Sequence, residues 1–102
     1  MVRVTQYNEI TEYMLETKKE YFLRYFKDRQ IDNNKMMMIT VRTPDSISDE
    51  LIINLECNID KKLEYYNEAY DDNLKLKTNP DVKITQYVYG HLGSIPVMER
   101  VK

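Results

Sequence analysis

The sequence predicts an α+β domain, with a mostly antiparallel sheet of three to four strands and two helices packed on one face. Three observations predict it. Residues 10–29 and 59–77 repeat apolar side chains at helical spacing, and residues 35–43, 50–58 and 82–89 alternate or concentrate apolar side chains as strands do. The length of 102 residues is typical of one domain. We therefore expect a single α+β domain over residues 1–102, with residues 90–102 as a tail or an edge strand.

The first predicted helix covers residues 10–29, which contain neither Gly nor Pro and are rich in helix-forming residues. The apolar side chains near its inner face are Ile10, Met14, Tyr21 and Tyr25, with Phe22 and Phe26 beside them. Because aromatic residues also favour strands, a strand over residues 21–26 is the alternative.

A hairpin is predicted next. Residues 35–43 place Met37, Ile39 and Val41 on one side, as a strand with an apolar face does. Residues 50–58 alternate without interruption, with an apolar set made of Leu51, Ile53, Leu55 and Cys57, and an opposite set made of Ile52, Asn54 and Glu56. A helix that uses Ile52, Leu55 and Ile59 fits fewer residues. The polar connection between the two segments is short, which favours an antiparallel hairpin.

The second predicted helix covers residues 59–77, where the apolar stripe is Ile59, Leu63, Tyr66, Tyr70 and Leu74. Asn58 or Asp60 is suited to cap its start, and Asn79-Pro80 is expected to stop it. Residues 82–89 then predict a core strand that Gly90 and Gly93 interrupt, and residues 95–101 predict a short edge strand or an ordered tail.

One internal echo bears on the topology. Residues 2–7 (VRVTQY) match residues 82–87 (VKITQY) with conservative changes, and the match does not continue beyond them. Chance explains such a repeat as well, but it supports a strand at residues 2–7. The predicted order is then β-α-β-β-α-β, which is the order of ferredoxin-like folds.

Few residues in the sequence are suited to catalysis or metal binding. His91 is the one histidine, so clusters of histidines that bind zinc are absent, and glycine-rich phosphate loops are absent too. Cys57 belongs to the apolar set of its predicted strand, where a small buried hydrophobic side chain is expected in place of a nucleophile. We therefore predict a protein that is not an enzyme, with no cofactor and no metal.

Charge is distributed unevenly along the chain. Residues 44–73 hold nine acidic residues against Lys61 and Lys62, a net charge of −7, whereas both flanks are mildly basic. Concentrated negative charge steers encounters with a basic surface on another protein. We predict a partner-binding surface made of Asp49, Glu64, Tyr65, Glu68, Asp71 and Asp72. The competing interpretation is an ordinary solvated helix face.

Two further functions remain as alternatives. A nucleic-acid-binding function would use the basic side chains of the first helix, Lys18, Lys19, Arg24, Lys27 and Arg29. Nearby acids and the overall net charge of −2 make direct contact with nucleic acid the weaker prediction. Nine tyrosines and the three methionines at positions 36–38 also suit contact surfaces, so a self-assembling module or a homodimer formed at a free sheet edge is the other alternative.

No run approaches the roughly 18 apolar residues that a membrane helix needs. The first ten residues also lack the apolar core of a secretory signal, and one cysteine makes no internal disulfide. We therefore expect a cytoplasmic location and no membrane partner.

Residues 61–90 contain a tyrosine-rich helix, an LKLK run at 74–77 and an NPxVKI strand start at 79–84. In these thirty residues the chain resembles small uncharacterised proteins of Gram-positive phages and prophages. The resemblance implies a compact protein in the cytoplasm of a host cell that binds a host or defence protein, and the acidic stretch implies that this partner has a basic surface. Anti-CRISPR inhibitors are one kind of such binder. No functional residue is transferred from the resemblance.

Overall fold

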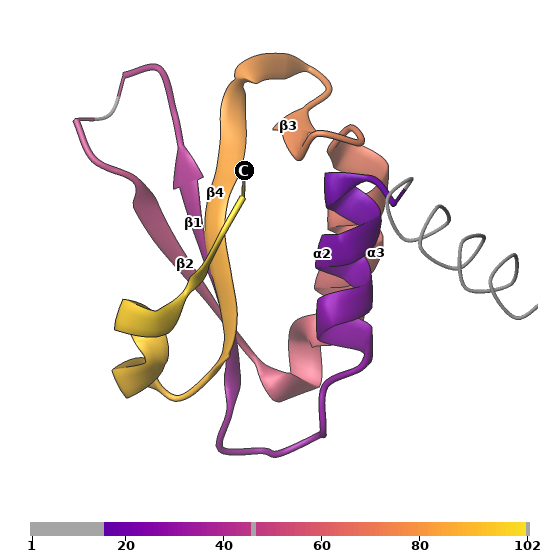
Figure 1. The fold of residues 1–102 in the computed structure, drawn as a ribbon, viewed down its shortest axis with the longest axis vertical. Coiled ribbons are helices and arrows are strands. Elements are labelled where there is room, and N and C mark those ends of the chain that lie inside the picture. The colour runs from indigo at the N-terminus through magenta and orange to yellow at the C-terminus, as the bar shows by residue number, and fades with distance from the viewer. Residues whose placement is uncertain (1–15, 46, 102) are drawn as a thin grey trace, which may run out of the picture.

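The computed structural model describes residues 16–45 and 47–101, and its elements form two layers (Figure 1). One layer is an antiparallel sheet of five strands. The other consists of helices α2 (Lys18–Lys27) and α3 (Ile59–Ala69), which cover one face of the sheet. The predicted α+β class is confirmed, with more strands than the three to four expected. The strand predicted at residues 2–7 lies outside the described residues.

The sheet is built around one long strand. The strands are β1 (Met36–Arg42), β2 (Glu50–Leu55), β3 (Lys75–Leu76), β4 (Asn79–Gly90) and β5 (Glu99–Arg100). Their order is β2-β1-β4-β3, and β5 also pairs with β4. The predicted hairpin is confirmed, because β1 and β2 pair in antiparallel register. The segment expected to be an edge strand or tail forms the 3₁₀ helix η2 (Leu92–Val97) followed by β5.

Helix α2 begins at a capping box. The Thr17 hydroxyl accepts a hydrogen bond from the Glu20 backbone N–H at 3.0 Å, and the Glu20 carboxylate accepts one from the Thr17 N–H. Thr17 itself has extended backbone angles, so the helix starts at Lys18 and does not run continuously through residues 10–29 as predicted. Phe22 and Phe26 are fully buried, and the alternative of a strand over residues 21–26 is wrong.

The predicted orientation of the second hairpin strand is wrong. Leu51, Ile53 and Leu55 are 41%, 42% and 57% exposed, whereas Asn54 and Glu56 are buried. The strand also ends at Leu55, because residues 56–58 form the 3₁₀ helix η1 (Glu56–Asn58). Cys57 lies in η1 and is exposed, so the prediction that it is buried is wrong as well. The reason is the contact that Glu56 makes, described below.

Helix α3 buries Ile59, Leu63 and Tyr66, as the predicted stripe requires, but it ends at Ala69 and not near residue 77. Tyr70 is already extended, and Leu74 adopts a left-handed φ of 60°. Leu74 is fully buried, and this burial offsets the strain of an unfavourable backbone conformation. Asn79-Pro80 therefore does not stop the helix; it begins β4.

Aromatic rings hold the helices on the sheet. The Phe22 ring lies edge to face on Tyr87 of β4, with 4.9 Å between ring centroids, and on Tyr66 of α3 at 5.6 Å. Each such pair stabilises the fold by about 0.5–1.5 kcal/mol beyond the stabilisation that comes from the apolar area it buries. One buried cluster thus joins α2, α3, β1 and β4.

At the other face of the sheet, η2 folds back closely on the end of β4. A Cβ atom added to Gly90 would lie 2.5 Å from the Ser94 Oγ and 2.9 Å from its Cβ. Neither glycine of the chain has a positive φ, so Gly90 is required by space and not by backbone conformation. The close approach fixes the position of η2 on the sheet.

We expect Gly90→Ala to lower the free energy of unfolding by about 1–3 kcal/mol, because Ser94 is held by its backbone and cannot move aside freely. Gly93→Ala is the matched control, since its Cβ would meet nothing within 4 Å. Chemical denaturation of both variants measures the difference. Equal stability of the two would show that η2 does not pack on Gly90.

Candidate interaction surfaces

Helix α3 brings three of the six predicted partner-binding residues together. Glu64, Tyr65 and Glu68 are all exposed, and Tyr65 is 49% exposed. Glu64 and Glu68 lie one helical turn apart on α3, so their side chains are neighbours on its surface. The ammonium of Lys62 lies 5.5 Å from the centroid of the Tyr65 ring. Neither glutamate forms an ion pair with a cation of residues 16–45 or 47–101.

Asp71 and Asp72 follow α3 and have different roles. The Asp71 carboxylate accepts backbone N–H groups of Asn73 and Lys75 at 2.9 and 3.0 Å, so it holds the turn that leads into β3. The side chain of Asp72 is 68% exposed and lies 3.9 Å from the Lys19 ammonium. Asp72 therefore extends the acidic surface of α3, whereas Asp71 stabilises the loop.

Asp49 is separated from the other five residues. It lies before β2, where its carboxylate accepts a hydrogen bond from the Arg42 Nε at 3.0 Å and another from the Thr85 hydroxyl. The hydrogen bond from Thr85 lowers the pKa of Asp49 most. The hydrogen bond and charge of Arg42 and the charge of Lys83 lower it further. Asp49 is thus neutralised within the domain and is not part of the acidic surface on α3.

Of the seven described tyrosines, three are buried and three are partly buried. Tyr66, Tyr70 and Tyr87 are buried, as predicted for the first two, and burial raises the pKa of each hydroxyl. Among the described tyrosines, Tyr65 is the one whose side chain is largely exposed. The tyrosine-rich surface that composition suggested is therefore reduced to one ring on α3.

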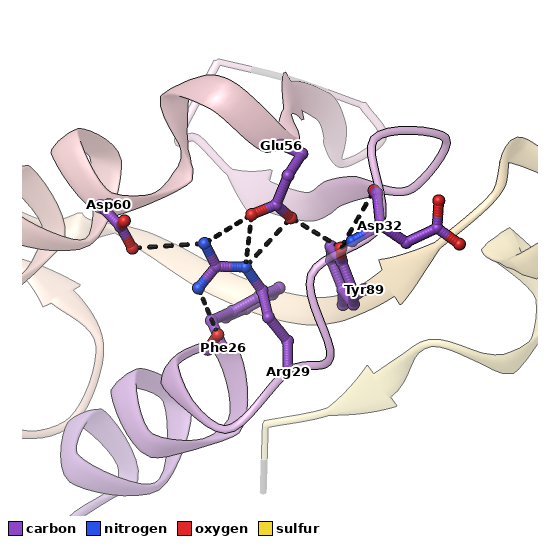
Figure 2. Close-up of polar contacts among 6 residues, drawn as sticks. All are labelled: Phe26, Arg29, Asp32, Glu56, Asp60 and Tyr89. Atoms are coloured by element: carbon purple, nitrogen blue, oxygen red, sulfur yellow. Dashed lines mark hydrogen bonds and ion pairs between the residues drawn. The ribbon is translucent and has the colours of Figure 1, made fainter.

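A buried ion pair, shown in Figure 2, links the loop after α2 to the start of η1, directly after β2. The Arg29 guanidinium donates to the Glu56 carboxylate from Nε at 3.1 Å and from Nη2 at 2.7 Å, and the two side chains are 5% and 8% exposed. The Tyr89 hydroxyl donates to the same carboxylate at 2.6 Å. Arg29 also donates to the Phe26 carbonyl at 2.7 Å and to the exposed Asp60 at 3.2 Å.

This network lowers the pKa of Glu56, first through the hydrogen bonds from Arg29 and then through that from Tyr89. All strong hydrogen-bonding positions of the carboxylate are used within the domain, so the network stabilises the fold and offers no open position to a ligand. The spacing of residues along the chain did not predict this network, because Glu56 falls in the polar set of an alternating strand. Its partner Arg29 is 27 residues away.

The cations of the first helix are mostly engaged. The Lys19 ammonium donates to the carbonyls of Asn67 and Tyr70, both at 3.1 Å. Arg24 makes two hydrogen bonds of 2.9 Å to Glu16, and Arg29 is buried as described. The predicted nucleic-acid surface on this helix therefore retains only Lys18 and Lys27 as exposed cations without such contacts among the described residues.

Other cations converge elsewhere, around a hollow of about 550 Å³ at the sheet. The basic side chains that line it come from five elements and are Lys18, Arg42, Lys75, Lys83 and Arg100. Asp49 is the acidic residue in this lining. We call this group the basic hollow. The sequence did not predict the basic hollow, because the cations that line it are scattered along the chain.

The outer strand β2 carries the largest exposed apolar stripe of the described sheet, made of Leu51, Ile53 and Leu55. Because β2 pairs with β1 on one side only, the backbone groups along its other edge have no strand partner among the described residues. The strand contains no Lys, Arg or Pro that would protect this edge.

The described residues contain no group of three or more His, Cys, Asp and Glu side chains arranged to hold a metal ion. In the same part of the chain, no helix is long and apolar enough to cross a membrane. Comparison of the chain with protein-family models, curated proteins and solved structures gave no match.

We expect Glu56→Gln to lower the free energy of unfolding by about 3 kcal/mol near neutral pH, because it leaves the buried Arg29 charge without its carboxylate. The lowered pKa means that Glu56 stabilises the fold fully above its ordinary value of 4.5, and that this stabilisation is lost as the pH falls through the folded value. The difference between wild type and variant should therefore shrink on acidification below 4.5.

Urea unfolding of both proteins at neutral and acid pH measures this difference. The control is Glu68→Gln, which alters an exposed carboxylate of the same type and should change stability little at either pH. If the two variants were equally stable at neutral pH, the ion pair would contribute nothing to the fold.

Proposed function

We propose that this protein is a non-enzymatic binding protein that contacts a partner protein through the exposed side of α3. This acidic helix face consists of Asp60, Glu64, Tyr65, Glu68 and Asp72. The observation that supports it best is the half-exposed Tyr65 ring on the same helix as two exposed carboxylates, Glu64 and Glu68, that no described cation pairs with. Asp60 adds a carboxylate that is 86% exposed although it touches Arg29.

The chemistry of this face fits a partner with a basic surface. Tyrosine is enriched among the residues that dominate binding energy, because its ring buries much area and its hydroxyl retains a polar contact. Surrounding carboxylates accelerate encounter with a cationic partner and disfavour acidic ones. The face is supported from behind by Leu63 and Tyr66, which are buried, so it is presented on a rigid element.

The resemblance of residues 61–90 to phage and prophage proteins supports a mobile-element origin. We therefore propose that the partner is a host or defence protein. This chain would inhibit or modulate it in the cytoplasm of the host cell, as anti-CRISPR proteins inhibit their targets. In that setting an acidic face would occupy a basic groove that otherwise receives nucleic acid.

We expect the double reversal Glu64→Lys/Glu68→Lys to weaken binding of the partner by at least about tenfold, because attraction becomes repulsion at the centre of the face. Tyr65→Ala should weaken binding to a similar extent through loss of buried ring area. Affinity isolation from host lysate provides the partner, and titration of the purified partner with each variant measures the effect.

The matched control is Asp45→Lys/Glu50→Lys, which changes the net charge equally at exposed positions of the hairpin. It should leave binding nearly unchanged, and thermal unfolding should show that all variants are folded. Full binding by the α3 reversal, or loss of binding only in the hairpin control, would remove α3 as the contact surface.

Self-association is a second candidate, favoured by the unpaired edge of β2. Antiparallel pairing of two β2 strands about Ile53 would place Leu51 opposite Leu55 of a second copy on the exposed face, so apolar side chains would meet apolar side chains. Such an arrangement gives a homodimer with a continuous sheet.

For this candidate, we expect wild type to show a dimer mass in sedimentation or light scattering, and Ile53→Lys to be a monomer. Ile31→Lys is the control, because Ile31 is 71% exposed and lies in the loop before β1. A monomeric wild type at every concentration tested would contradict self-association.

A further inference from the structure

Three cations stand in direct register across three neighbouring strands. Lys83 of β4 is the register partner of Arg42 on β1 and also of Lys75 on β3. Side chains of direct antiparallel partners lie on the same face, with Cβ atoms roughly 5 Å apart. Like charges placed this way repel each other and destabilise the sheet. The sequence contains more acidic than basic residues, yet no acidic residue stands between the cations of this row.

The row faces away from the helices. Each of the three cations follows or precedes a residue of the core: Arg42 follows Val41, Lys83 precedes Ile84, and Lys75 follows Leu74. Successive side chains of a strand alternate between faces, so Arg42, Lys83 and Lys75 point to the open face of the sheet. Helix α3, which carries most of the acidic helix face, lies in the layer on the other side of the sheet (Figure 1).

The basic hollow is formed where this row meets two more cations. β3 pairs with β4 at Asn79 and Lys83, whereas β5 pairs at Gln86 and Tyr87, and the hollow opens beside β4 between these two pairings. Lys18 and Arg100 complete its lining. A second hollow of about 460 Å³ shares Arg42, Lys75 and Lys83, and adds Asp81. The row therefore lines two adjoining depressions.

Little of this charge is neutralised within the described residues. Of the five cations, Arg42 alone forms an ion pair there, with Asp49. Five positive charges against one carboxylate leave an excess of four in the lining. The second oxygen of Asp49 accepts from Thr85, and although the charge of Lys83 acts on this carboxylate, its one ion pair among the described residues is with Arg42.

We propose that the basic hollow binds a chain of phosphate groups, which replaces the missing counter-charge. A volume of about 550 Å³ suits a small polyanion or a short stretch of backbone. Arginine and lysine are the side chains that recognise phosphate, by forked hydrogen bonds and by point charge. The described residues that line the hollow include no aromatic side chain, so phosphates are recognised there without stacking on bases. This site is independent of the function proposed for α3.

Two sources carry this chemistry, a small polyphosphate ligand and the backbone of single-stranded nucleic acid. The probes are inorganic tripolyphosphate and a single-stranded DNA oligonucleotide, titrated separately into the purified protein at low salt. We expect binding to wild type, and weakening by about tenfold or more in Lys75→Gln/Lys83→Gln, because two charge-assisted contacts are lost. Without ligand this variant should be at least as stable as wild type, since repulsion is relieved.

The control is Lys27→Gln/Lys61→Gln, which removes the same charge from exposed positions on the helices and should change affinity by less than about twofold. Failure of both probes to bind folded wild type, or equal weakening by the two double variants, would overturn the site. Oligonucleotide affinity that rises with length and falls steeply with salt identifies a nucleic-acid backbone. Binding of tripolyphosphate alone identifies a small ligand, and either result upholds the basic hollow.

Discussion

The buried ion pair between Arg29 and Glu56 is the constraint on which the arrangement of the sheet depends. A carboxylate removed from water costs several kcal/mol unless a cation and hydrogen bonds compensate it, and Arg29 with Tyr89 supply both. The three residues come from the loop after α2, the start of η1 directly after β2, and the end of β4. Satisfying one carboxylate therefore fixes three segments relative to each other.

The same constraint determines which side of β2 faces the helices. Side chains of a strand alternate, so an inward Glu56 is continued by inward Asn54 and Ile52, and Leu51, Ile53 and Leu55 are left on the open face. Hydrophobicity alone favours the opposite orientation. The arrangement also buries the Asn54 amide nitrogen without an acceptor in reach among the described residues. The ion pair and its hydrogen bonds outweigh both costs, and they leave an apolar stripe on the surface.

Local patterns explain what the sequence did predict. The strand over residues 35–43, the hairpin and the core stripe of α3 each depend on spacing within one segment, and the structure confirms them. The sequence did not predict where α3 ends, because Tyr70 and Leu74 continue the helical spacing. Both side chains are buried, but they lie in the segment after the helix and not in the helix itself. A period of apolar residues indicates burial more reliably than it indicates the backbone conformation that achieves the burial.

The same distinction applies to the two charged surfaces. Glu64, Tyr65 and Glu68 lie together because one helix holds them, whereas Asp49 was grouped with them only by its place in an acidic stretch and lies apart. The cations of the basic hollow lie between residues 18 and 100, so any average along the chain dilutes them. Only strand pairing brings Arg42, Lys83 and Lys75 together.

The net charge of −2 is consequently a poor guide to what the protein attracts. At physiological salt, charges are screened beyond about 8 Å, so a ligand responds to the charges near its own binding position. Cross-strand neighbours lie well within that distance, whereas α3, which carries Glu64 and Glu68, belongs to the helix layer. One small domain can therefore present a negative face to a basic protein and a positive hollow to phosphates, and its segregated charges, not their sum, decide both interactions.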